Sequence, residues 1–88
     1  MKLKYGFVVR EVGGRSVAVA IGARGADTPS MITLNDSGKV IWQALGRETS
    51  VDEIVDRLMA EFDVSREVAE IDVIKFLDTL RSGGLLIE

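Results

Sequence analysis

The sequence predicts one α+β domain, residues 1–88, in which a three-stranded antiparallel sheet precedes three helices. Up to Leu34, apolar and polar residues alternate as they do in strands. After Asp36, apolar residues recur every three to four positions, as on one face of a helix. Between the two patterns lies Asn35, whose side chain suits a helix N-cap. The 88 residues leave room for a single small core.

The first two strands are expected over residues 7–12 and 17–21. Gly13-Gly14 suits the two-residue turn between them, because glycine accepts a positive φ at both turn positions. In the second strand, the larger side chains share one face, and Ala18 and Ala20 share the other. We expect the face with the larger side chains to pack against the rest of the protein, and the alanine face to be thinly covered.

A third strand is predicted for residues 30–34, after a loop that contains the only proline, Pro29. The strand is short, and a proline just before it suits a position where no ladder hydrogen bond is lost. Both features indicate an edge strand. An edge strand leaves one row of main-chain N–H and C=O groups without a partner.

Helices are predicted for residues 36–45, from Ser50 to about Phe62, and for residues 66–82. Ser50 and Glu53 have the spacing of a capping box. The second helix has apolar residues at regular helical spacing: Val51, Ile54, Val55, Leu58, Met59 and Phe62. The apolar tail, residues 85–87, is expected to add a strand or to pack as a lid.

The third helix has more apolar residues than one buried stripe requires. The expected core stripe comprises Ala69, Val73, Phe76, Leu77 and Leu80. Three further apolar residues lie outside it, namely Val68, Ile71 and Ile74. One margin of the stripe is lined by Asp72, Lys75 and Thr79. The additional apolar residues either contact the tail, the hairpin or the second helix, or they form a groove or an oligomer contact.

The residue types argue against an enzyme and against a metal or cofactor. The chain has no cysteine and no histidine, which removes thiol nucleophiles, imidazole bases and Cys/His metal sites. Its carboxylates are spread along the helices, and its glycine pairs lack the spacing of phosphate loops. No apolar run approaches the roughly 20 residues that span a bilayer. The first residues lack the apolar segment of a signal peptide, so we expect a cytoplasmic protein.

The net charge of −3 is unevenly distributed. Residues 1–34 carry five basic and two acidic residues, whereas residues 35–88 carry six basic and twelve acidic residues. Winged helix-turn-helix domains also consist of a sheet and three helices, and they often bind DNA through a recognition helix. Here the third helix would have that role, but it is net acidic and would repel phosphates. DNA binding therefore stays the weaker alternative, alongside a structural oligomerisation module built on Ile71 and Ile74.

Five short segments together carry a recognisable pattern. They are Ile32-Thr33-Leu34-Asn35-Asp36-Ser37-Gly38, Ile41-Trp42, Thr49-Ser50-Val51-Asp52-Glu53-Ile54-Val55, Asp72-Val73-x-x-Phe76-Leu77-x-x-Leu80 and Gly84-Leu85-Leu86. With this spacing, the chain resembles the PqqD-like family, the elements that recognise precursor peptides of ribosomally synthesised natural products. The resemblance extends from about Phe7 to the end of the chain.

The resemblance implies a winged helix-turn-helix fold and a non-enzymatic role. From the residue types, we expect no cofactor and neither nucleic acid nor a membrane as partner. Domains of this family bind the leader segment of a precursor peptide and present it to a modifying enzyme, often a radical SAM protein. The leader adds as a strand to the third strand and lies against the third helix. Carried over to this chain, the peptide-binding residues are Ser30, Met31, Ile32, Thr33, Leu34, Val68, Ile71, Asp72, Lys75 and Thr79. The opposite margin of the helix, with Ile74 and Asp78, remains the alternative.

Two departures from the family concern the pathway. Members that act in pyrroloquinoline quinone synthesis tend to carry Leu/Tyr-Pro-Glu-Gly before the third strand and a tryptophan near the C-terminus. This chain has Ala26-Asp27-Thr28-Pro29-Ser30-Met31 and Leu85-Leu86-Ile87 at those places. These differences favour a stand-alone homologue that serves another peptide pathway.

Overall fold

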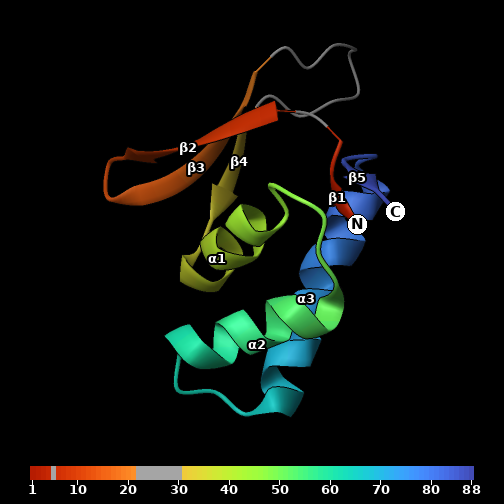
Figure 1. Ribbon diagram of the computed structural model, residues 1–88. Coiled ribbons are helices and arrows are strands. Elements are labelled where there is room, and N and C mark those ends of the chain that lie inside the picture. Colours follow the sequence, from red (N-terminus) through yellow and green to blue (C-terminus); the bar gives the residue numbers. More distant parts are fainter. Residues whose placement is uncertain (5, 22–30) are drawn as a thin grey trace.

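The computed structural model describes residues 1–4, 6–21 and 31–88, with the side chains of residues 20 and 21 excepted. In chain order, the elements are β1 (Lys2–Leu3), β2 (Gly6–Val12), β3 (Arg15–Ile21), β4 (Met31–Leu34), α1 (Asp36–Ala44), α2 (Val51–Glu61), α3 (Arg66–Ser82) and β5 (Leu86–Ile87). Strands β2, β3 and β4 form an antiparallel sheet in that order (Figure 1). The predicted α+β class, with three sheet strands before three helices, is confirmed.

A small second sheet joins the two ends of the chain. Strand β1, which the sequence analysis did not predict, pairs with β5 (Figure 1). Leu3 also donates its N–H to the carbonyl of Leu45 at 2.9 Å, which ties β1 to the end of α1. Arg81 donates two hydrogen bonds to Glu88, at 2.8 and 2.7 Å, and so holds the tail against α3. The apolar tail thus adds a strand, one of the two outcomes expected for it.

The β2–β3 hairpin has the predicted turn. Val12 pairs with Arg15, and the two residues between them, Gly13 and Gly14, have φ values of 59° and 80°. Side chains disfavour such positive φ values at consecutive positions, and glycine does not. The register then runs without a bulge to Gly6 opposite Ile21.

The prediction for the faces of β3 was wrong. The small residue Ala18 lies in the core that the helices share, whereas the larger Val17 lies on the opposite face, outside that core cluster. The reason lies in the neighbouring strands, whose larger side chains supply the bulk on the alanine face. Val9 of β2 and Ile32 of β4 are the residues paired with Ala18, and both pack against the core.

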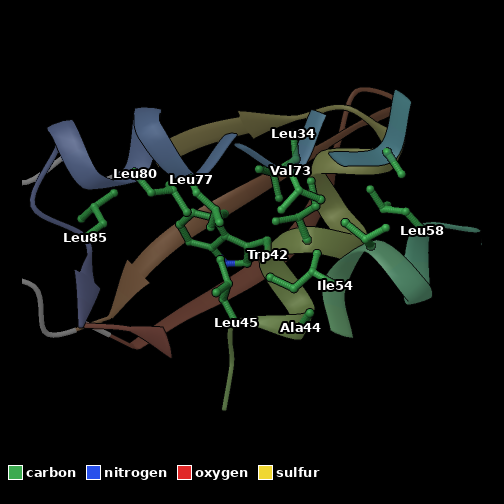
Figure 2. Packing of buried hydrophobic residues seen from close by; sticks show 14 residues of the cluster. Leu34, Trp42, Ala44, Leu45, Ile54, Leu58, Val73, Leu77, Leu80 and Leu85 are labelled. Carbon is green, nitrogen blue, oxygen red and sulfur yellow. The ribbon is translucent and has the colours of Figure 1, made fainter. Parts of the chain in front are cut away.

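The helices begin where the sequence places them. Asn35, Ser50 and Ser65 are the N-caps, and each side-chain oxygen accepts a main-chain N–H of the following first turn. The apolar stripes of the helices meet the sheet around Trp42, which is 3% exposed (Figure 2). Met59, which the periodicity places in the stripe of α2, is instead 39% exposed. Among the residues that the structure describes, no helix has the length and apolar character needed to cross a membrane.

Candidate functional site: a strand edge beside a helix

Strand β4 lies at an edge of the three-stranded sheet, as predicted. It pairs with β3 on one side, from Val19 opposite Met31 to Ser16 opposite Leu34. Within the described parts of the chain, no further strand pairs with its other side. An edge of this kind is a template for the addition of another strand.

The hairpin turn fixes which residues of β3 bond to which neighbour. In a two-residue hairpin, the residues that flank the turn form a hydrogen-bonded pair, and such pairs alternate along the ladder. Val12 and Arg15 are that first pair here. Arg15 and Val17 therefore direct their main-chain groups to β2, and Ser16 and Ala18, which alternate with them along the strand, direct theirs to β4.

The same alternation decides which groups lie on the open edge of β4. Leu34 and Ile32 are the partners of the β3 residues whose main-chain groups face β4, so they take up the ladder bonds. The N–H and C=O groups of Met31 and Thr33 consequently face away from the sheet. The open edge thus offers two donors and two acceptors, spaced for an incoming strand.

The predicted strand residues divide into two classes by their side chains. Ile32 is half-buried and Leu34 is 4% exposed, and both pack in or against the core. Met31 and Thr33 are exposed and lie on the other face of the sheet. Ser30, the remaining predicted residue, lies outside the described residues.

The end of β4 is held by the cap of α1. The side-chain oxygen of Asn35 accepts the main-chain N–H of Gly38 at 2.7 Å and the hydroxyl of Ser37 at 3.3 Å. Gly38 is buried, and a Cβ atom there would lie 2.8 Å from Oδ1 of Asn35 and 3.1 Å from Cε2 of Phe76. The absence of a side chain at position 38 therefore allows both the cap and the close packing of α3 on α1.

A hollow of about 250 Å³, here named the first hollow, lies between the start of α1 and one margin of α3. The α3 residues Asp72, Lys75 and Thr79 line it, as does Phe76. From the other side, it is lined by Asn35, Ser37 and Ile41. The margin of α3 predicted for the peptide is therefore the one that adjoins the end of β4.

The other predicted residues of α3 lie farther round the helix. Val68 is 48% exposed and Ile71 is 54% exposed, and neither lines the first hollow. Ile74, on the alternative margin, is 51% exposed and does not line it either. The hollow also contains residues that the sequence analysis did not assign to the site, notably Ser37 and Phe76. In the sequence, Ser37 lies beside the N-cap and Phe76 belongs to the predicted core stripe, so both positions indicated only a structural role.

Charges near the site are arranged around the hairpin and α1. Glu11 accepts hydrogen bonds from Lys39 at 3.0 Å and from Ser16 at 2.9 Å, which connects β2, β3 and α1. The hydrogen bond from Lys39, followed by that from Ser16, lowers the pKa of the Glu11 carboxyl group. Within the described residues, no polar or charged side chain is buried and no cluster of metal-ligating residues is present. The arrangement offers main-chain pairing and surface hollows, which suit binding of an extended peptide.

Comparison with known proteins places this geometry in a family. The family model of coenzyme PQQ synthesis protein D (PqqD) matches residues 25–86. The chain belongs to the PqqD family. Among solved structures, TbiB1 in complex with the TbiA(beta) leader peptide aligns with a TM-score of 0.71 and 28% sequence identity. That alignment covers 98% of this PqqD-family chain and 94% of the TbiB1 chain. None of the curated proteins matches the chain significantly.

Proposed function

We propose that this PqqD-family chain binds the leader segment of a ribosomally synthesised precursor peptide and presents it to a modifying enzyme, such as a radical SAM protein. Membership of the family and the similarity to a protein solved with a leader peptide support this proposal. Neither comparison supports DNA binding. The chain itself supplies recognition, and the partner enzyme supplies the chemistry.

One observation carries the proposal: the open edge of β4 adjoins the hollow along α3. An added strand gains affinity from main-chain hydrogen bonds to Met31 and Thr33. Its side chains alternate between the two faces of the sheet. Those on the side of Ile32 and Leu34 are directed toward α3, where Asp72 and Lys75 line the first hollow. Affinity thus comes from the strand edge, and selectivity comes from the helix.

The experiment removes one donor from the open edge without removing a ladder bond. In Thr33→Pro, the missing N–H is the one that faces away from β3, so the sheet keeps its hydrogen bonds. The ring also occupies the space where the incoming strand would approach. The matched control is Thr33→Val, which changes the side chain and keeps the N–H group.

The neighbouring genes are searched for a short reading frame, and the probe is a synthetic peptide that spans the N-terminal half of its product. Loss of one main-chain bond, with an unpaired acceptor left on the leader, costs about 1–3 kcal/mol. Calorimetric titration should therefore show binding to Thr33→Pro that is weaker by about fivefold to a hundredfold. Thr33→Val should bind like the unaltered protein. Equal affinity of the two variants, both with native circular dichroism spectra, would contradict strand addition at β4.

A further inference from the structure

A second hollow, of about 380 Å³, continues from the first. The two share Asn35, Ser37 and Asp72. Beyond these residues, the second hollow is lined by Leu58, Phe62, Val64 and Asp36. It therefore lies where the start of α1, the end of α2 and the first half of α3 meet.

The second hollow has an apolar lining and acidic neighbours. Leu58, Phe62 and Val64 supply apolar surface from the end of α2 and the segment after it. Asp36 and Asp72 are exposed and also line it, and no basic side chain does so within the described chain. The volume exceeds the roughly 150 Å³ of an apolar cavity that accommodates a benzene ring. By volume, this open hollow has room for one large apolar side chain.

The carboxylates of this hollow differ in their ion pairing from other charged side chains on the helices. Arg66 of α3 pairs with Asp56 at 3.0 Å and with Glu70 at 3.3 Å. In residues 31–88, in contrast, no ion pair engages Asp36 or Asp72. The hollow thus presents two exposed carboxylates that have no cationic partner within that range. A basic group on a bound peptide would complement them.

The hollow lies at one end of the strand edge. Strand β4 runs from Met31 to Leu34, and the next residue, Asn35, lines both hollows. A peptide that pairs with β4 leaves the sheet at this end. An extended chain advances about 3.3 Å per residue. The first residues beyond the paired stretch therefore reach the second hollow.

We propose that the bound leader places one large apolar side chain, such as leucine or phenylalanine, in the second hollow, with a lysine or arginine next to it. The basic residue lies against Asp36 and Asp72, so an acidic leader is rejected at this place. This inference rests on the proposed function, because it extends the same peptide beyond β4. It assigns Phe62, Val64 and Asp72 to leader selectivity.

The test uses peptides obtained without knowledge of the natural leader. A random 16-residue peptide library is displayed and selected on the intact protein. A selected peptide is kept for analysis if it binds Thr33→Pro more weakly than the unaltered protein and binds Thr33→Val equally well. Their sequences are expected to share a large apolar residue with an adjacent lysine or arginine, just outside the stretch that pairs with β4.

Charge reversal then tests the assignment by fluorescence anisotropy. Asp72→Lys should weaken such a peptide about three- to tenfold, and replacement of the peptide's basic residue by glutamate should restore binding to this variant. Glu67→Lys is the matched control, because Glu67 is exposed on α3 and lines neither hollow. Replacement of the peptide's apolar residue by alanine should weaken its affinity about tenfold.

The outcomes separate the two proposals. Peptides that depend on the β4 edge but show neither residue preference, or that respond equally to Asp72→Lys and Glu67→Lys, overturn the extension and leave strand addition standing. If no selected peptide responds to Thr33→Pro, both the proposed function and the extension are overturned. A shared apolar–basic pair together with restoration by charge exchange establishes the extension.

Discussion

Gly38 connects the cap of α1 to the packing of α3, and its replacement by alanine gives a sharp prediction. In a helix, alanine is normally favoured over glycine by about 1 kcal/mol. Here the added Cβ atom would lie 2.8 Å from Oδ1 of Asn35 and 3.1 Å from Cε2 of Phe76. The first contact displaces the cap, which contributes about 1 kcal/mol. The second contact displaces the Phe76 ring from its edge-on contact with Trp42, which costs about 0.5–1.5 kcal/mol.

The two losses exceed the gain in helix propensity. Gly38→Ala is therefore expected to lower the free energy of unfolding by about 1 kcal/mol, measured by urea denaturation. The melting temperature should fall by about 4–8 °C, as expected for a small domain. In an Asn35→Ala background, the same substitution should cost less, because the displaced acceptor is already absent. A Gly38→Ala protein that is more stable than the unaltered one would refute this account of position 38.

Two other predictions concern the surroundings of the strand edge. Asn35→Ala should cost about 1 kcal/mol of stability, and it should also weaken leader binding in protein shown to be folded, because the cap holds the end of β4. Unchanged affinity in calorimetry would show that the cap does not position the edge. Lys39, and after it Ser16, lowers the pKa of the Glu11 carboxyl group from its ordinary value of 4.5. The carboxylate therefore contributes to stability above pH 4.5, and this contribution is lost as the pH falls through the lowered pKa of the folded protein. In NMR titrations, Lys39→Gln should return the pKa of Glu11 toward 4.5, and Ser16→Ala should do so by less; no change with Lys39→Gln would contradict the assigned cause.

The boundaries of the helices could be predicted because they are set by local chemistry. Ser65 caps α3, and the helix spans Arg66–Ser82, as its sequence pattern indicates. Gly84 follows with a φ of 70°, a value that favours glycine and ends the helix. The turn at Gly13 and Gly14 is likewise determined by the two glycines that form it. In these cases, the residue that determines the structure lies within a few positions of the structure it determines.

Which face of a strand is buried, and which residues form the candidate site, depends on residues that are distant in sequence. For these two features the sequence-based prediction was incomplete. Ala18 lies in the core because Val9 and Ile32 on neighbouring strands supply the missing bulk. The strand edge was predicted from local features, whereas the margin of α3 that adjoins it depends on how the helix is rotated against α1. The second hollow combines the ends of three elements. No pattern within one segment indicates that Phe62 and Asp72 line the same surface.

The most direct test of the central claim is an NMR titration of the ¹⁵N-labelled protein with the leader peptide of a precursor encoded beside the gene. The account predicts that amide shifts concentrate at residues 31–34 and along α3, around Asp72, Lys75 and Thr79. At a peptide concentration near the dissociation constant of the unaltered protein, Thr33→Pro should strongly reduce the shifts at the strand, while Thr33→Val retains them. Shifts confined to other surfaces, or an unchanged pattern in Thr33→Pro, would contradict leader binding at the β4 edge.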